Sequence, residues 1–394
     1  MNLRLFFTCL LALILSKCST DTINVRNEKQ GRLKATFKLE ITDVKKFLLD
    51  NETAPKPQYT QLFEIPGGVR YFTFINRYNN SIYFYDYSTC TFIKKVLFNK
   101  KGPDAILIMT GYFIESIDSI YLYDKALTQI ALTNDNGKVL KRISLRGNTA
   151  DKNWFIDYPQ YVPQTVTPFV KINDELLFPG QHMGTIPKAM IEKFKFTARI
   201  NLRSHQVNFS YLYPKELYGY NYNWEGRLFT EVFEDINHEN NKLIFSFPVS
   251  HDLYIADFKN EEFTKVYAGS NIAGTIHSMS SDPKQTTDKM TLTHFVQQDT
   301  YTAVKYDRYR NIYYRVLLNA IHDATVQTSW REKPVTIIVM DKDFKYLGES
   351  TIGKGDKEWF WQNSFVTREG LNIEYIEKDS EDYLTLKIFT LKNI

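Results

Sequence analysis

A short strand–turn–strand pattern recurs along the chain and strongly limits the folds open to it. Each copy is an apolar, aromatic-rich run, then a polar turn, then a second and partly alternating run, which is the signature of paired β-strands. Six copies are marked by residues 81–86, 119–124, 196–201, 252–257, 335–341 and 383–391. Sequential copies of one such unit predict an all-β, six-bladed β-propeller in which each unit forms one blade.

The spacing of the units sets the blade count. The chain has 394 residues, so six blades leave roughly 60 residues for each, more than the 40–45 of a compact repeat. Seven blades remain possible because residues 134–137, Asn-Asp-Asn-Gly, are themselves a hairpin signal that blurs the second unit. A two-sheet sandwich is less favoured, because the units are sequential and the long connections fall between them.

Closure of the ring is also readable from the sequence. The last unit ends at Ile394 without an outermost strand. We predict that the N-terminal run 33–40 supplies that strand and hides both edges. Two segments, 42–49 and 186–194, carry an acceptable cap or an early proline and are predicted to be short helices. The aromatic residues, 15% of the chain, and the few glycines, 17, suit a β-rich core.

The N-terminus reads as an export signal. Arg4 precedes an apolar stretch that is too short to span a bilayer stably. Residues 15–18, Leu-Ser-Lys-Cys, resemble the lipobox of bacterial lipoproteins, although Lys17 departs from the small residue usual there. We predict a signal peptide over 1–17, lipidation of Cys18, a flexible tether over 18–32 and one propeller domain over 33–394. Simple secretion and an uncleaved anchor are the alternatives.

Charge and cysteine content restrict the partners and the chemistry. The formal net charge of +4 gives no sign of a nucleic-acid partner. If Cys18 carries lipid, Cys90 is the only thiol of the mature chain, so no internal disulfide is expected. Cys90 lacks the neighbours of a catalytic thiolate and is predicted to be inert. We expect the protein to contact the membrane through its lipid alone. We also expect it to be located in the cell envelope, and the outer membrane is the favoured membrane. The oligomeric state is not indicated.

Several segments, taken in order, resemble one family. They are residues 101–105, 244–248, 306–315, 340–344 and 367–371. Together they resemble an uncharacterised six-bladed propeller lipoprotein family of Gram-negative gut anaerobes, a domain of unknown function with a TolB-like or NHL-like propeller. The resemblance covers about residues 30–394. It implies a propeller fold and an envelope lipoprotein, and it implies no reaction.

Strong motifs for catalysis or metal binding are missing. The chain has no Gly-x-Ser-x-Gly, no His-Glu-x-x-His, no Cys-x-x-Cys pair and no EF-hand loop. Residues 269–275 have the glycine spacing of a P-loop but lack its lysine, so a loop is predicted there. Residues 134–136 and 341–343 are interpreted as turns because they do not supply the oxygen ligands of calcium. We predict no metal and no cofactor.

The long connections are the most informative feature for function. In a propeller of four-stranded blades they all emerge on one face, and loops on a rigid scaffold are where binding usually resides. They are residues 148–164, 181–194, 213–226, 270–298, 319–334 and 352–363. Aromatic rings and histidines in them are candidate ligand-binding residues, namely Trp154, His182, Tyr220, Tyr222, Trp224, His277, His322, Trp330 and Trp359.

Each candidate also has a purely structural interpretation. The rings suit stacking on sugars or peptide side chains, but they equally suit packing the loops onto the blades. Histidines converging on the channel could bind zinc or transfer protons, yet no two have ligand spacing. Arg227, Arg308 and Arg315 could clamp an anion or satisfy carbonyls and aspartates of the blades.

These observations favour a non-enzymatic, envelope-anchored propeller that binds a glycan, a peptide or a partner protein through the looped face. The alternative is a propeller hydrolase or lyase acting on an extracellular polymer, with acids such as Asp323, Glu332 and Glu358 near the loop histidines. A structural subunit of a larger envelope complex is the third possibility.

Overall fold

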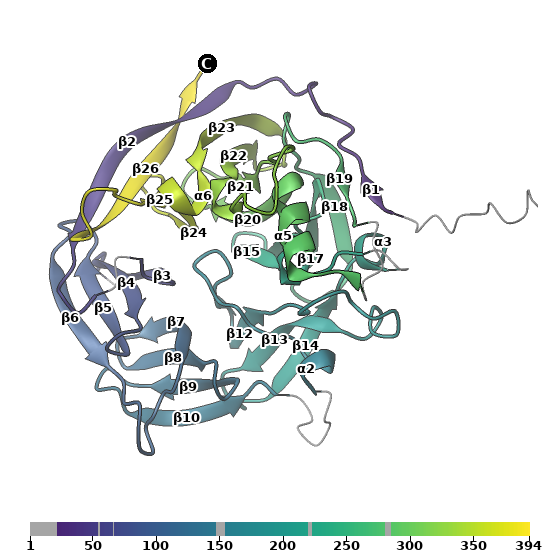
Figure 1. Ribbon diagram of the computed structural model, residues 1–394. Coiled ribbons are helices and arrows are strands. Elements are labelled where there is room, and N and C mark those ends of the chain that lie inside the picture. Colours follow the sequence, from purple (N-terminus) through teal and green to yellow (C-terminus); the bar gives the residue numbers. More distant parts are fainter. Residues whose placement is uncertain (1–21, 54–55, 66, 147–153, 220–222, 280–284) are drawn as a thin grey trace, which may run out of the picture.

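Six four-stranded antiparallel sheets stand around a central axis in the computed structural model, which describes residues 22–394 except 54–55, 66, 147–153, 220–222 and 280–284 (Figure 1). The chain is therefore a six-bladed β-propeller, as predicted, and the seven-bladed and sandwich alternatives are wrong. Each of the six sequence markers falls in a different blade. The marker at residues 119–124 is the second strand of its blade, whereas the other five are third strands.

The blades are numbered in chain order, each from its innermost strand. Blade 1 contains β3 (Thr60–Glu64), β4 (Arg70–Asn76), β5 (Ser81–Asp86) and β6 (Phe92–Leu97). Blade 2 contains β7 (Met109–Ser116), β8 (Ser119–Asp124), β9 (Gln129–Thr133) and β10 (Val139–Ser144). Blade 3 contains β11 (Val170–Ile172), β12 (Glu175–Pro179), β13 (Lys195–Asn201) and β14 (Val207–Leu212). Blade 4 contains β15 (Phe233–Asn237), β16 (Lys242–Ser246), β17 (Asp252–Asp257) and β18 (Phe263–Tyr267). Blade 5 contains β20 (Thr300–Asp307), β21 (Ile312–Leu318), β22 (Pro334–Asp341) and β23 (Tyr346–Lys354).

Blade 6 joins the two ends of the chain. It holds β24 (Trp359–Val366), β25 (Leu371–Tyr375) and β26 (Tyr383–Asn393), and its outermost strand is the N-terminal β2 (Phe37–Leu48). β2 runs antiparallel to β26 (Figure 1). The predicted closure is confirmed, but the helix expected over 42–49 is wrong. That segment lies mostly within β2. Its pairing with β26 supplies hydrogen-bond partners for the backbone groups on the edge of β26 and buries Phe47, and a separate helix would do neither.

Aspartates and asparagines at strand ends explain the repeating pattern in the sequence. Asp307 Oδ1 accepts hydrogen bonds from the backbone N–H groups of Tyr309 and Arg310, both at 3.0 Å. Asp86 and Asp341 hold the turns after β5 and β22 in the same way. A short acceptor side chain that bonds the backbone two residues on is a turn-forming device. The interpretation of residues 134–136 and 341–343 as turns is confirmed.

The segment before β2 is not a free tether over the described residues. β1 (Asn24–Val25) pairs with β19 (Ile276–His277), and Ile23 exchanges hydrogen bonds of 3.0 Å with Ser278. Asn27 Nδ2 donates to the carbonyls of Ser270 and Ala273. The flexible tether predicted over 18–32 is therefore wrong from Ile23 onward, because this segment fills backbone partners offered by the loop after β18.

As far as the structure describes them, the long connections lie on one face, as predicted. We call it the looped face, and the opposite face is the hairpin face. The short helices of the looped face are α2 (Trp154–Asp157), α3 (Lys215–Tyr218), α4 (Arg227–Thr230), α5 (Asp288–Gln297), η2 (Trp330–Glu332) and α6 (Gly355–Glu358). The helix predicted over 186–194 is wrong: this stretch makes hydrogen-bonded turns, such as Lys193 N–H to Met190 O at 2.9 Å, because Pro187 and the buried Ile191 and Phe194 fold it back onto blade 3.

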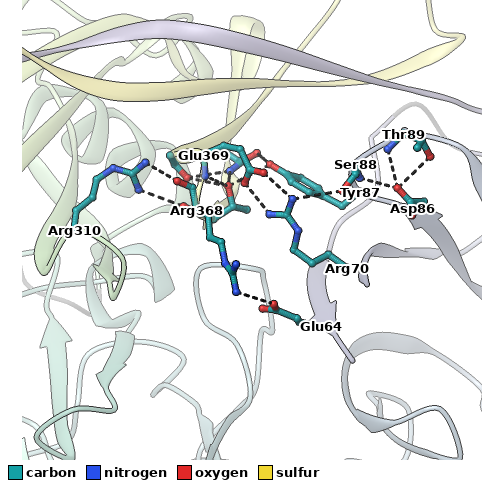
Figure 2. A network of polar contacts seen from close by, with 12 residues as sticks. Glu64, Arg70, Asp86, Tyr87, Ser88, Thr89, Arg310, Arg368 and Glu369 are labelled. Carbon is teal, nitrogen blue, oxygen red and sulfur yellow. Dashed lines mark hydrogen bonds and ion pairs between the residues drawn. The ribbon is translucent and has the colours of Figure 1, made fainter. Parts of the chain in front are cut away.

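A polar network on the hairpin face ties blades 5, 6 and 1 together (Figure 2). Arg70 of blade 1 makes a two-pronged ion pair with Glu369 of blade 6, at 2.8 and 2.7 Å, and its guanidinium lies 4.8 Å from the ring centroid of Tyr87. Arg310 of blade 5 donates to the carbonyl of Arg368 at 2.8 Å. The ion pair with Arg70 lowers the pKa of Glu369 to about 2. This network fastens the ring where its last and first blades meet.

The blades pack through aromatic side chains. Tyr83, Phe84 and Tyr85 of β5 are all buried, which confirms the prediction that the strand aromatics form the core. Phe196 of blade 3 packs against Phe245 and Phe247 of blade 4, with ring centroids 5.5 and 5.9 Å apart. In the described part of the chain, the helices are all too short or too polar to cross a bilayer.

Candidate functional site

The central channel of the propeller is filled by a turn that we call the plug, residues 162–168, which lies between blades 2 and 3 in sequence. The turn is closed by the Thr167 N–H, which donates to Gln164 O at 3.0 Å, and by the Gln164 N–H, which donates to Thr167 Oγ1 at 2.9 Å. Pro163 and Pro168 flank it. Prolines on either side of a turn limit the conformations open to it.

The plug contacts inner strands all around the ring. Thr165 accepts a hydrogen bond of 2.8 Å from the Thr60 N–H of blade 1 through its hydroxyl, and its carbonyl accepts one of 3.2 Å from Lys305 Nζ of blade 5. The Val166 N–H donates to Gln362 O of blade 6 at 3.2 Å. In blade 2, a Cβ at Gly111 would lie 2.6 Å from Pro163, so only glycine allows this approach. The plug divides the channel in two.

The looped-face cavity is the smaller of the two spaces, at about 170 Å³. It lies under the long loops, at the end of the channel where the inner strands begin. Its lining comes from the plug, from the long loops and from strand ends on the looped face: Val162, Gln164, Gln181, Arg227, Leu228, Glu231, Phe233, Phe295, Thr302, Leu318, Trp330, Trp361 and Gln362.

Polar groups in the looped-face cavity have unused hydrogen-bonding capacity. The side-chain oxygens Oε1 of Gln164 and Gln362 are buried and find no partner among the described residues. The Arg227 side chain makes no hydrogen bond or ion pair within that part of the chain. Burial raises the pKa of Glu231 to about 7, against the opposing charge of Arg227. Buried acceptors without donors are costly, so this arrangement suits a ligand that brings O–H or N–H groups.

The hairpin-face cavity lies beyond the plug and measures about 320 Å³. Its lining combines aromatic, aliphatic and charged side chains. The lining is Tyr59, Thr60, Gln61, Leu62, Glu64, Phe113, Thr165, Pro168, Phe169, Asp235, Ile236, His238, Lys305, Tyr306, Arg308, Tyr309, Phe365 and Val366.

Charged groups in the hairpin-face cavity are mostly engaged by one another or by the backbone. Burial lowers the pKa of Lys305, while the nearby Asp235 and Glu234 oppose that shift. Asp235 accepts the Tyr306 N–H at 2.7 Å. At the rim, Arg308 donates to Glu64 at 3.4 Å and to Tyr309 OH at 2.9 Å. This cavity can hold a ligand, but its polar atoms are better satisfied than those under the loops.

Of the predicted ligand-binding residues, Trp330 is the one whose described side chain reaches a channel cavity. Trp224 is buried and its indole N–H donates to Leu217 O at 2.7 Å. Trp359 packs against Tyr375 and Phe389. His182 is buried beside Phe194. Rings enclosed in this way fasten loops to blades, so the structural interpretation fits these three better than contact with a ligand.

The remaining candidates are dispersed. His277 is exposed on β19 and its Nδ1 lies 2.5 Å from Asn24 Oδ1, and His322 is exposed in the loop before β22. Trp154 begins α2, and its side chain lies outside what the structure describes, as do Tyr220 and Tyr222 altogether. In the described ranges, no three His, Cys, Asp or Glu side chains are grouped to hold a metal ion.

The three arginines named as candidate anion-binding residues have different surroundings in the structure. Arg315 is fully buried and satisfies carbonyls of blade 4, Arg308 pairs with Glu64, and Arg227 lines the looped-face cavity. Sequence reasoning missed Gln164, Glu231 and Gln362, because single glutamines and glutamates carry no motif. The proline-flanked turn at 163–168 was the one available signal for the plug.

The fold and the site define a plugged β-propeller protein with two separate cavities on its axis. The chain belongs to the DUF4221 family, described as a domain of unknown function, whose family model matches residues 35–351. No curated protein matches it significantly.

Solved structures agree on the fold. A DUF4221 family member from Bacteroides vulgatus is similar, with a TM-score of 0.78, 18% identity, and coverage of 91% of this chain and 99% of that one. A Bacteroides fragilis protein described as exported is similar with a TM-score of 0.53 and 11% identity, over 90% of this chain and 95% of that one. At these identities the likeness establishes the propeller fold alone. The match to the family model confirms the predicted resemblance to a six-bladed propeller family that is a domain of unknown function.

Proposed function

We propose that this protein is a non-enzymatic, envelope-anchored binding protein that takes a glycan into the looped-face cavity. The observation that carries the proposal is the pairing of two tryptophans, Trp330 and Trp361, with buried glutamine oxygens that lack donors. Aromatic rings stack on the C–H faces of sugars, while hydroxyl groups supply the missing donors. A peptide or a partner protein, the other ligands considered, offers fewer hydroxyl groups for the same acceptors.

A glycan array tests this proposal. Wild-type protein is expected to bind a subset of glycans, and Trp330→Ala is expected to weaken that binding by about fivefold or more, the loss of one good anchor. Tyr78→Ala is the matched control, because Tyr78 is an aromatic residue of the looped face, 73% exposed and outside the cavity. Equal binding by wild type and Trp330→Ala, or no glycan bound at all, would contradict the proposal.

A hydrolase or lyase acting on an extracellular polymer is the second candidate function. It is favoured by one observation, the convergence of Asp235, His238 and Lys305 in the hairpin-face cavity. Such a mixture of acid and base groups is what proton transfer needs. Cleavage of an array glycan by wild type but not by Asp235→Asn would favour this candidate over simple binding.

Envelope anchoring rests on the lipobox-like residues 15–18 and the lipidation proposed for Cys18. Metabolic labelling with a palmitate analogue is expected to mark the wild-type protein and not Cys18→Ala. Cys90→Ala, which removes the other thiol of the mature chain, is the control and is expected to label like wild type. An unlabelled wild type would contradict the anchor.

The N-terminal contacts give the anchor a geometric consequence. The chain is hydrogen-bonded to the loop after β18 from Ile23 onward. Five residue steps separate Cys18 from Ile23, and they span at most about 18 Å when fully extended. An acylated Cys18 would therefore hold the propeller close to the bilayer by the edge at β1 and β19.

A further inference from the structure

We infer that the looped-face cavity recognises the end of a glycan chain, and that the terminal sugar carries a carboxylate, as a hexuronic acid does. The inference rests on the proposed function and specifies the part of the glycan that enters. Its observations are the plug beneath the cavity, the size of the cavity and the arginine at its side.

The plug makes the looped-face cavity a blind pocket. Val162 and Gln164 of the plug line it, whereas Thr165 and Pro168 of the same turn line the hairpin-face cavity, and the two linings share no residue. The hydrogen bonds from Thr60, Lys305 and Val166 hold the turn in place. A polymer cannot pass through such a channel, so a chain that enters the pocket enters by its end.

The volume limits how much of the chain enters. Sites for drug-sized ligands measure roughly 300–1,000 Å³, and this cavity measures about 170 Å³. One sugar ring is therefore the natural occupant, with the next unit of the chain outside among the loops.

Arg227 gives the pocket its preference for an acid. Arg227 is exposed at the edge of the cavity, and its guanidinium has no hydrogen-bond or ion-pair partner among the described residues. Glu231 of the same lining feels the charge of Arg227, but the two make no ion pair in the described chain. Planar guanidinium N–H groups match a carboxylate in two-pronged geometry. Trp330 lies in the same lining, so a flat ring and a cation are offered together.

The other polar groups fit the hydroxyls of the same sugar. Gln362 is 8% exposed and its Oε1 has no partner in the described chain. Gln164 Oε1 is also buried without a hydrogen-bond partner in the described chain, while Gln164 Nε2 lies 3.5 Å from Glu231 Oε1. Two acceptors and a carboxyl group at one wall require donors from the ligand, and ring hydroxyls supply them.

Calorimetric titration with D-galacturonic acid and D-glucuronic acid tests the inference, with D-galactose and D-glucose as matched neutral sugars. We expect at least one acid to bind about tenfold more tightly than its neutral partner. Arg227→Gln is expected to remove that difference, since a hydrogen bond to a charged group is worth about tenfold or more. Arg203→Gln, which removes a surface arginine whose side chain is 80% exposed on the hairpin face, is the control for net charge.

Chain length provides the second measurement. A trimer of the preferred acid is expected to bind within about threefold of the monomer, because one ring fills the pocket. Equal binding of acidic and neutral sugars, or affinity that rises steeply with chain length, would overturn the inference while leaving glycan binding intact. Binding of a free amino acid or a peptide carboxyl end that depends on Arg227, with no sugar bound, would overturn the glycan class. Absence of any sugar binding here and on the array would remove the proposed function itself.

Discussion

Replacing Arg315 by methionine is expected to lower the free energy of unfolding by about 3–5 kcal/mol. Arg315 lies on β21 and is fully buried, and its guanidinium packs 3.9 Å from the ring centroid of Tyr301. Burial lowers the pKa of Arg315 to about 10, so the side chain stays charged at neutral pH. Methionine matches the aliphatic part of the side chain and removes the donors, the charge and the contact of the guanidinium with Tyr301.

The size of the effect follows from the number of partners left behind. All five N–H groups of Arg315 are used, on Ser246 Oγ and on carbonyls of blade 4 and its edge, at 2.8–3.2 Å; these carbonyls belong to Ser250, His251, Asp252 and Ala268. Each buried acceptor left without a donor costs about 1–3 kcal/mol. The sum over the acceptors is partly offset because the desolvation cost of the buried charge is also removed. Blade 4 and blade 5 are joined at this point, so the loss is expected to be cooperative across the ring.

Urea unfolding followed by circular dichroism measures this prediction. Arg315→Lys keeps the charge but has three donors in place of five, and we expect an intermediate loss. Arg203→Met, which truncates an exposed arginine on the hairpin face, is the control and is expected to fall within about 0.5 kcal/mol of wild type. A loss below about 1 kcal/mol for Arg315→Met would show that the guanidinium is not a joint between the blades.

Removing the closing strand β2 is expected to have an even larger effect. A chain that begins at residue 50 lacks the partner of β26 at eleven paired positions and loses Phe47, which is fully buried. Loss of one such phenylalanine costs about 3–5 kcal/mol, against a total stability of about 5–15 kcal/mol. The exposed edge of β26 would also pair with other chains. We therefore expect aggregates in place of a soluble monomer.

Size-exclusion chromatography, with and without a peptide of residues 36–49, tests this expectation. The peptide can add to the free edge as a strand and is expected to restore a monomer. A peptide of the same composition in shuffled order is the control and is expected not to do so. A chain without β2 that elutes as a monomer and melts like wild type would contradict closure by this strand.

The fold was largely predictable because its signals are local. Strands such as β5 and β17 show aromatic and β-branched runs that end in Asp86 and Asp257, and those carboxylates bond the turn directly. The segment 42–49 was mispredicted because its polar and apolar residues fit a helix and a strand equally well. The choice between them is made by the free edge of β26, which begins at Tyr383, 335 positions after its partner Leu48.

The candidate site was much less predictable. Trp224 and Trp330 both lie in or near long loops, and nothing local distinguishes the one that packs under Leu217 from the one that lines a cavity. Trp224 is held by the backbone of α3, and Trp330 lines the cavity beside the plug, so three-dimensional packing decides their roles. Gln164 and Gln362 become candidate ligand contacts only when folding brings the plug against blade 6, so that both residues line one cavity.

The central claim is that the cavity beneath the long loops is the binding site. A crystal structure of the wild-type protein with the strongest glycan from the array tests it most directly. We expect one terminal sugar in the looped-face cavity, in contact with Trp330, Arg227 and Gln362. A glycan bound instead in the hairpin-face cavity beside Lys305 and Asp235, with the looped-face cavity left empty, would contradict it.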